Sequence, residues 1–568
     1  MTRSRTLLLC LFLFVAATGC RSAEVLPTVA LQADDPAIGL PTLAAPTTAA
    51  SRPAGQEPTI VSPTVAATPT VTTPSRPTPE PWRVRIMPGV PADLVAAMRA
   101  VIEAQPGRFT QATESEGADV TLLVGDGEPL ATWIYAVVVP FATVNEATTI
   151  ADLQANWRNG GTPQALVDEN SGPLLTAAWG QGAGRLVDAE NLVAELWQQR
   201  PSWSLVPFHH LDPSLKVLSV DGVSPLDTSF DASLYPLAFA VGLQGDAEAV
   251  TSLRDAWSGP HTNRDGEKIT RLAMSGVTAL VRATAYQMMI RGISYPGEEV
   301  AAVLQAADVA HVSNEVSFVP DCPPPHFIGD PVFCSDPRYM GLLEEIGIDV
   351  VELTGNHLND WGPQYLPYTL DLYDAAGMQY FGGGRDLTQA QEPLIVEHNN
   401  NRIAFLGCNP VGPAGGWATA DRAGSAPCDY DAFRAQIGEL QSTGHVVIVT
   451  QQYQEIYHYA PTAQQQADFR TFAEAGAGAV SGSQGHHAQG FDFHEGTFIH
   501  YGLGNLFFDQ MDMMGTRQTL VDTYTIYDNR LLSVQMWTGL IENYARPRQM
   551  SAEERSELLQ TLFAASGW

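Results

Sequence analysis

Apolar runs alternate with amphipathic stretches along most of the chain beyond residue 82. Between residues 83 and 265, runs such as 120–124 and 134–139 predict strands, and the apolar spacing over 94–102 predicts a helix. Strands and helices in alternation are typical of an α/β domain. We therefore expect residues 83–265 to form an N-terminal α/β domain.

A second α/β region is expected over residues 266–543. Continuous apolar runs predict its strands, and helical patterns at 339–346 and 365–376 lie between them. The predicted strands are 277–281, 309–312, 350–353, 403–406, 446–450, 479–481 and 498–501. Continuous runs indicate strands that are covered on both faces, and open α/β sheets place their sites at the strand ends. Residues 544–568 are expected to form a C-terminal helical tail.

The first 82 residues lack this alternation. Arg3 and Arg5 precede an apolar run over 7–17, which predicts a secretory signal peptide over residues 1–19. Small residues directly before Cys20 resemble a bacterial lipobox, which implies a lipid on Cys20 that anchors an extracytoplasmic protein to the cell membrane. An ordinary secretory signal, which would leave a soluble protein, is the alternative. Residues 20–82 are rich in proline and threonine and predict a disordered linker.

Charge and cysteine content narrow the function. The chain has 62 acidic and 30 basic residues and a formal charge of -32, which disfavours binding to nucleic acid through a broad basic face. Beyond the signal, the cysteines form two local pairs, Cys322 with Cys334 and Cys408 with Cys428. We expect two disulfides, because an exported chain reaches an oxidising compartment. A zinc site is the alternative, although neither pair has the close spacing of a thiolate knuckle.

Polar groups follow five of the predicted strands. They are Ser313-Asn314-Glu315, Thr354-Gly355-Asn356-His357 with Asp360, Gln451 with Glu455, Gly482-Ser483-Gln484-Gly485-His486, and Gly504-Asn505. Their order and spacing resemble the CapA family of poly-γ-glutamate and capsule synthesis proteins, which have a calcineurin-like metallophosphoesterase fold. The most specific pieces are Asn356-His357-x-x-Asp360-x-Gly362 and the segment 501–507. The resemblance covers about half of the chain and implies a layered α/β/β/α domain.

The resemblance also implies roles for individual residues. Asn356 and His486 would bind metal, and His357 would be the catalytic proton donor. Glu315 and Glu455 stand at positions of glutamates in the family's motifs and are further catalytic candidates. The substrate-binding candidates are Asp360, Asn505 and Arg282.

Three departures from the family pattern predict a depleted metal site. Val277 stands where the family has the aspartate of Gly-Asp, and Gln451 and Gln484 stand where it has histidines. An amide oxygen is a poor replacement for imidazole toward zinc, manganese or iron. We therefore expect one divalent ion of unknown identity or none.

Three interpretations of the cluster stay open. The first is a remodelled single-ion or metal-free site that still binds substrate. The second is a pseudoenzyme that uses its cleft for binding alone. The third is a working metallohydrolase with His311 or His487 as a substitute ligand.

The resemblance implies a role in the synthesis, retention or export of poly-γ-glutamate or another capsular polymer. The expected partners are an extracellular anionic polymer or its synthesis and export machinery, the membrane through the lipid anchor, and no nucleic acid. A metal-dependent phosphoester or amide hydrolase is one alternative. A solute-binding receptor is another, because residues 135–141 followed by 150–157 resemble a strand and helix of periplasmic solute-binding proteins. Generic buried α/β strands explain these two segments equally well.

Overall fold

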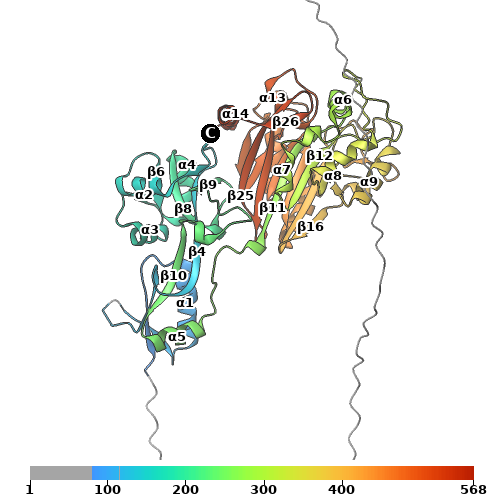
Figure 1. Ribbon diagram of the computed structural model, residues 1–568. Coiled ribbons are helices and arrows are strands. Elements are labelled where there is room, and N and C mark those ends of the chain that lie inside the picture. The colour runs from blue at the N-terminus through green and yellow to red at the C-terminus, as the bar shows by residue number, and fades with distance from the viewer. Residues whose placement is uncertain (1–79, 114, 330) are drawn as a thin grey trace, which may run out of the picture. The chain divides into compact units, whose positions relative to one another are not determined.

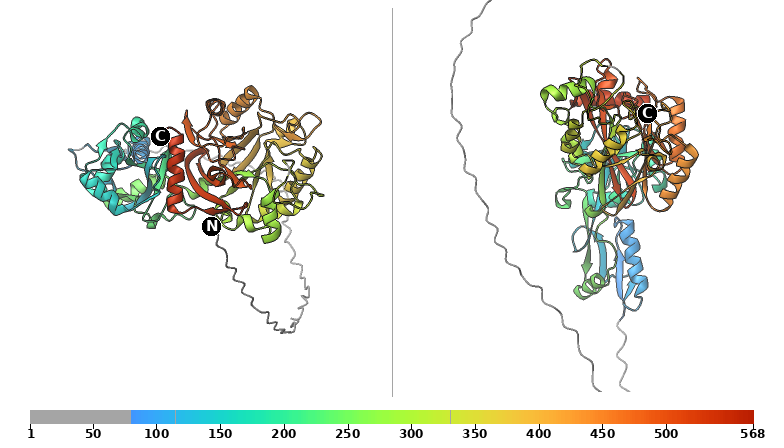
Figure 2. Two further views of the ribbon diagram at one scale, coloured as in Figure 1. Left: turned by 90° about the horizontal axis from the view of Figure 1, so that it is seen from above. Right: turned by 90° about the vertical axis from the view of Figure 1, so that its right-hand side faces the viewer.

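The structure is a computed structural model that describes residues 80–113, 115–329 and 331–568. The predicted signal peptide, the lipid on Cys20 and the linker up to residue 79 lie outside the described residues. Residues Thr78–Trp568 form one compact unit, shown in three views in Figures 1 and 2. Among the described residues, every helix is too short or too polar to cross a membrane.

The first part of this unit, which we call the N-terminal lobe, is built on a 10-stranded sheet. Its strands are β1 Trp82–Ile86, β2 Phe109–Gln111, β3 Val120–Val124, β4 Glu128–Pro140, β5 Ala147–Thr148, β6 Gln164–Val167, β7 Arg185–Leu186, β8 Ser202–Pro207, β9 Leu215–Val220 and β10 Ala238–Gly245. Its helices are α1 Ala92–Ala104, α2 Ile150–Asn159, α3 Ser171–Trp179, α4 Leu192–Gln198 and α5 Ala247–Ala256, with short 3-10 turns η1 Ala189–Asn191, η2 Phe208–His210, η3 Ala232–Leu234 and η4 Gly266–Lys268.

Strand β4 is central to the N-terminal lobe. Its 13 residues pair antiparallel with β10, β8 and β9 in turn, and the stretch from Trp133 to Phe141 is buried throughout. The main path of the sheet runs β2-β1-β3-β10-β4-β8-β6-β7. Strands and helices alternate along this part of the chain as the sequence predicts.

The remaining residues, which we call the C-terminal lobe, form two large sheets and a two-stranded ribbon. Strands of the eight-stranded sheet are β11 Ile269–Thr278, β12 Val309–Asn314, β13 Val350–Glu352, β14 Gln379–Phe381, β23 Asn505–Phe507, β24 Gln518–Tyr527, β25 Arg530–Glu542 and β26 Arg546–Gln549. Strands of the six-stranded sheet are β16 Leu394–His398, β17 Asn401–Cys408, β19 Val446–Gln452, β20 Ala479–Ser483, β21 Phe491–His494 and β22 Thr497–His500. The ribbon is β15 Gly383–Gly384 with β18 Gly424–Ser425.

The C-terminal lobe also contains a set of helices. They are α6 Arg282–Arg291, α7 Ala301–Gln305, α8 Met340–Glu345, α9 Tyr365–Ala376, α10 Leu387–Ala390, α11 Tyr430–Ser442, α12 Ala463–Glu474, α13 Met514–Arg517 and α14 Ala552–Ala565, with 3-10 turns η5 Tyr295–Gly297 and η6 Pro337–Tyr339. One core packs α6, α8 and α9 on the eight-stranded sheet, and another packs α11 and α12 on the six-stranded sheet. Leu272, Ile448 and Phe498 belong to a third core formed by residues of both sheets. The predicted α/β/β/α layering is confirmed.

The C-terminal end of the chain is more strand-rich than the sequence predicts. Strands β24 and β25 pair antiparallel over ten residues of β24 and extend the sheet beyond β11 (Figure 1). The range 544–568, expected to be a helical tail, holds strand β26 as well as helix α14. Ser551 and Glu554 form a capping box that starts α14.

Both predicted disulfides are present, Cys322–Cys334 and Cys408–Cys428. The first closes a loop of the C-terminal lobe between β12 and η6, and the second joins the end of β17 to the residues just before α11. Because all four sulfur atoms are used, the alternative of a zinc site at these cysteines is wrong.

Phe141, directly after β4, packs into the C-terminal lobe. Its ring centroid lies 5.4 Å from that of Phe491, 5.6 Å from Phe498 and 6.0 Å from Trp568, and its side chain is 0% exposed. Aromatic rings of this size bury large apolar areas and pack edge to face at such spacings. Phe141 therefore contributes to the core between the two sheets, although it lies outside the C-terminal region in sequence.

Truncating this ring tests its contribution. Phe141→Ala should lower the free energy of unfolding by about 3–5 kcal/mol, because the change removes buried area and leaves a cavity. Urea unfolding followed by tryptophan fluorescence measures the effect. Phe327→Ala is the matched control, since Phe327 is 41% exposed. Equal losses for the two variants would contradict the assignment of Phe141 to the core.

Candidate functional site

The ends of parallel strands from both large sheets meet in one cluster of polar side chains. Glu315 follows β12 and Asn356 follows β13 in the eight-stranded sheet, whereas Gln452 ends β19 and Gln484 follows β20 in the six-stranded sheet. Strands β12 and β13 are parallel, as are β19 and β20, so their carboxyl ends lie at the same edge. The structure thus brings together residues that the sequence places at separate strand ends.

The amide of Gln452 is the centre of this cluster. Its Nε2 lies 3.3 Å from Glu315 Oε1 and 3.3 Å from Asn356 Oδ1, and it also donates to Gln484 Oε1. Gln452 Oε1 lies 3.0 Å from the Ser483 hydroxyl, which fixes the orientation of the amide. Three side-chain oxygens therefore surround one uncharged nitrogen that has two hydrogens.

The prediction that Gln451 lies at this site was wrong by one residue, because Gln452 lies in the cluster instead. Gln451 Nε2 donates to the Tyr430 hydroxyl at 2.6 Å, in contact with the Cys408–Cys428 disulfide and away from Glu315. Successive side chains of a strand point to opposite faces. A continuous buried run gives no sign of which face belongs to the site, which is why the sequence did not separate the two glutamines.

Val277 lies near the end of β11, whereas the sequence predicts a strand that begins there. It is 1% exposed, and its backbone N–H donates to Gly504 O at 3.0 Å. Strand β11 pairs here with β23, with Val277 opposite Asn505. The position offers an apolar side chain and no oxygen to the cluster.

The segment after β20 has a strained backbone. Gln484 has φ 63° and His486 has φ 51°, in the left-handed region that residues other than glycine rarely adopt. Such strain gathers at functional sites, where the surrounding structure maintains it. Here it turns the side chain of Gln484 toward Gln452 and that of His486 toward β23.

His486 is held by Asn505. Asn505 Nδ2 donates to the backbone oxygens of His486 and Thr516 at 3.2 and 3.0 Å, so its Oδ1 accepts from His486 Nδ1 at 2.8 Å. The imidazole stacks on Phe508 with ring centroids 5.1 Å apart. With Nδ1 protonated, neutral His486 keeps the lone pair on Nε2. Asn505, predicted to bind substrate, is 0% exposed and orients His486 instead.

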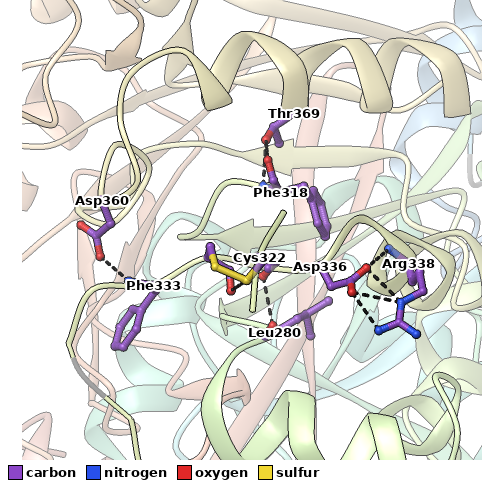
Figure 3. Close-up of a disulfide and its surroundings, with 10 residues drawn as sticks. Leu280, Phe318, Cys322, Phe333, Asp336, Arg338, Asp360 and Thr369 are labelled. Atoms are coloured by element: carbon purple, nitrogen blue, oxygen red, sulfur yellow. Dashed lines mark hydrogen bonds and ion pairs between the residues drawn. A yellow bond between two sulfur atoms is a disulfide. The ribbon is translucent and has the colours of Figure 1, made fainter. Parts of the chain in front are cut away.

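His357 and Asp360 form a hydrogen-bonded pair, and Figure 3 shows Asp360 beside the disulfide loop. His357 Nδ1 donates to Asp360 Oδ2 at 2.7 Å, and the same oxygen accepts from the backbone N–H of Phe333 at 2.8 Å. The ring of Phe333 lies 4.4 Å from that of His357. This arrangement fixes the imidazole and leaves Nε2 for a partner from outside.

The environments of His357 and Glu315 shift both pKa values upward. Burial disfavours charge on His357, but the hydrogen bond to Asp360 and the negative charge of Glu315 outweigh it and raise the pKa of the imidazole. Burial raises the pKa of Glu315, and the positive charges of His486 and His357 only partly offset this. At a given pH the cluster is therefore more protonated than the same residues would be in water.

Arg282 lies near this pair, at the start of α6. Its guanidinium donates to Asp509 through Nε at 3.1 Å and through Nη2. It stacks on both Phe333 and Phe508, with 4.9 Å from the guanidinium carbon to each ring centroid. Its side chain is 25% exposed and that of Asp509 is 7% exposed. Arg282 thus remains reachable from solvent beside the cluster.

Glu455 lies on the exposed rim rather than inside the cluster. Its Oε2 accepts from the Tyr457 hydroxyl at 2.7 Å, and its negative charge contributes to the raised pKa of His357. Beside the rim, a cavity of about 420 Å³ is lined by residues of the disulfide loop together with Arg282, Tyr339 and Trp361. The loop that Figure 3 shows around Cys322 therefore forms one wall of a hollow next to His357.

Sequence reasoning missed the support beneath the cluster. The Ser483 hydroxyl lies 3.0 Å from Glu352 Oε1 as well as from Gln452, and Glu352 Oε2 lies 3.3 Å from His311 Nε2. Glu352 lies in an apolar run that predicts a strand, and it ends β13. An acidic residue in such a run was the signal from which this buried support could have been found.

The two proposed substitute ligands do not reach the cluster. His311 is 1% exposed in the core and pairs with Glu352. His487 bonds the backbone oxygen of Ala488 at 2.8 Å and lies edge-on to Tyr459. The idea that either one replaces a lost ligand beside Glu315 is therefore wrong.

Comparisons with known proteins agree with the motifs at these strand ends. Residues 253–510 match the family described as "Bacterial capsule synthesis protein PGA_cap". "Capsule biosynthesis protein CapA" of Bacillus anthracis is 28% identical over 191 residues, which are 33% of this chain and 46% of that protein. "PGA biosynthesis protein CapA" of Bacillus subtilis (strain 168) is 28% identical over 170 residues, 30% of this chain and 45% of that protein. The chain spans about half the length of these relatives.

Solved structures give weaker likenesses. A 5'-nucleotidase precursor from Thermus thermophilus is 13% identical with a TM-score of 0.32, covering 52% of this chain and 59% of that one. An ABC-type phosphate transport receptor from Vibrio cholerae is 12% identical with a TM-score of 0.25, covering 30% of this chain and 93% of that one. The family match and the strand-end motifs together show that residues 253–510 of this chain are similar to the CapA family.

Proposed function

We propose that this chain is a lipid-anchored, extracytoplasmic protein that acts in the synthesis, retention or export of poly-γ-glutamate or another capsular polymer. The names of the matching family and relatives support a role in this process. The observation that carries the proposal for the site is the position of the Gln452 amide among three oxygens. The site acts by binding the polymer, without the two-metal chemistry of metallophosphoesterases.

The donor set does not fit two divalent ions. A two-metal centre needs several carboxylates and imidazoles around a pair of ions. Here the strand ends provide one carboxylate, Glu315, whose pKa is raised by burial, and the amides of Asn356, Gln452 and Gln484. The N–H groups of Gln452 occupy the space in which a cation would have to bind the oxygens of Glu315, Asn356 and Gln484. His486 Nε2 is left as one imidazole donor, and Val277 contributes none.

The side chains of the cleft that solvent can reach suit the binding of an anionic polymer. His357 has a raised pKa and Arg282 is partly exposed, so the cleft presents two cationic groups. Phe333 lies against both of them, and the adjoining cavity of about 420 Å³ offers apolar surface for the methylene groups of a polymer. The chain as a whole is acidic, so such contacts are local rather than spread over a basic face.

Restoring the lost ligands tests the metal-free site. The triple variant Val277→Asp, Gln452→His, Gln484→His should bind Mn²⁺, whereas the unchanged protein should retain none after dialysis. The matched control replaces Gln452→His by Gln451→His, which should not bind because residue 451 faces Tyr430. Elemental analysis of the dialysed proteins gives the metal content. Two transition-metal ions retained by the unchanged protein would overturn the proposal.

The pH dependence of polymer binding tests the role of His357. Its pKa is raised, so the imidazolium persists above the ordinary value of about 6.5 and is lost as pH rises through the folded pKa. Affinity for poly-γ-glutamate, measured by calorimetry, should therefore fall as the pH rises, and the midpoint of this fall should lie above about pH 6.5. His357→Gln should weaken binding and flatten this profile. His445→Gln, at a histidine bonded locally to Thr443 and Leu440, should leave the profile unchanged. Affinity that rises with pH would contradict the assignment.

The anchor is tested at Cys20, which lies outside the described residues. Cys20→Ser should move the protein from the membrane fraction to the soluble fraction, because the thiol that would carry the lipid is gone. Ser22→Ala should leave it in the membrane fraction. Fractionation of cells followed by immunoblotting measures both. Retention of the Cys20→Ser protein at the membrane would show that the lipid anchor is not what holds it.

A further inference from the structure

A small cavity in the N-terminal lobe lies where two helices begin. It has a volume of about 50 Å³ and is lined by Asp93, Tyr135, Asp168, Ser171 and His210, among others. Asp93 lies in the first turn of α1, Asp168 precedes α3, Tyr135 lies on β4, and His210 ends the turn η2. This cavity is separate from the strand-end cluster of the C-terminal lobe and plays no part in the function proposed above.

Tyr135 is the first sign that the cavity takes a ligand. Its side chain is 1% exposed, and its ring is fixed edge-on against Phe239 with centroids 5.8 Å apart. Within the described part of the chain, no side-chain or backbone group forms a hydrogen bond with its hydroxyl, and the residue lines the cavity. The hydroxyl therefore faces the cavity with its donor and its acceptor capacity unused, and a ligand in the cavity can bond it.

Two carboxylates give the cavity its charge. Asp168 Oδ1 accepts from the backbone N–H groups of Asn170 and Ser171 at 3.0 and 2.6 Å. A hydrogen bond with His209 lowers the pKa of Asp93, so this carboxyl is ionised. The positive ends of α1 and α3 are thus already balanced by side chains of the protein. An anion entering here would meet two negative charges, whereas a cation would be stabilised.

A metal ion is the obvious alternative, since Asp93, His209 and His210 offer ligand atoms within 4.8 Å of one another. The hydrogen bonds argue against it. Asn263 Oδ1 accepts from Ile134 N at 2.7 Å and its Nδ2 donates to Ile134 O at 2.9 Å, which fixes the amide. The same Nδ2 lies 3.2 Å from His209 Nδ1, which must then accept. Neutral His209 therefore carries its proton on Nε2, 3.2 Å from Asp93, and has no lone pair there for a metal.

We infer that this cavity binds the ammonium group of an organic amine. An ammonium group has three N–H donors and one positive charge, and Asp93, Asp168 and Tyr135 offer acceptors around a space that exceeds the volume of one water molecule, about 30 Å³. A second hollow of about 440 Å³ shares Ala92 and Asn170 with the cavity and provides room for the rest of the molecule. Arg99 lines that hollow and would attract a carboxylate on the same ligand.

Three probes of equal chain length test this on the full chain. Hexylamine and 6-aminohexanoate carry the ammonium group, and hexanoate lacks it. Calorimetry should show binding of both amines and none of hexanoate. Asp93→Asn and Tyr135→Phe should each weaken amine binding about 10- to 100-fold, as expected for a lost hydrogen bond to a charged group. Tyr235→Phe, which removes a buried hydroxyl elsewhere in the same lobe, should leave the affinity unchanged.

Thermal unfolding checks that each variant folds, and Tyr135→Phe should fold normally because its hydroxyl has no partner to lose. Three results would overturn the inference. They are the absence of binding by either amine up to about 10 mM, equal binding of hexanoate or inorganic phosphate, and tight Zn²⁺ binding that His209→Gln abolishes.

Discussion

The chemistry of the C-terminal cleft depends on one amide, that of Gln452. Its nitrogen joins Glu315 and Asn356 of one sheet to Gln484 of the other, so it holds together the strand ends that form the cluster. A pair of metal ions would hold the same strand ends by charge, and would keep Glu315 ionised. An amide brings no charge. Burial therefore raises the pKa of Glu315, and the hydrogen bond from Gln452 only partly offsets this rise.

The cationic groups of the cleft lie at its edge. His357, oriented by Asp360, and Arg282, paired with Asp509, are the cationic groups that solvent can reach. Each of them bonds a carboxylate and lies against an aromatic ring, while His357 Nε2 stays available to a partner from outside. They can still attract an anionic polymer, and their fixed geometry lowers the entropy lost on binding.

Much of the fold followed from the sequence, because buried parallel strands are continuous apolar runs. Helix α9 has the predicted bounds, Tyr365–Ala376, and most predicted strands of the two large sheets are present. The strand expected over 277–281 is wrong in its bounds, because β11 covers Ile269–Thr278. Strand β24 was missed since its apolar pattern is interrupted by Asp522, which the structure buries in an ion pair with His500 at 2.6 Å. The wrong placement of Gln451 in the site, instead of Gln452, has the same cause. The apolar pattern of a strand indicates that its residues are buried. It does not indicate on which of the two buried faces a polar side chain lies.

The cavity in the N-terminal lobe could not be predicted from such patterns at all. Asp93, Tyr135 and Asp168 are far apart in the sequence and none belongs to a motif, so only the fold brings them together. Their charge is opposite to that of the cleft edge in the C-terminal lobe. A glutamate polymer joined through its side chains carries a carboxylate on every residue and an amine at one end. The two lobes would thus recognise groups that occur in the same class of molecule, although each site rests on its own residues and would survive the failure of the other.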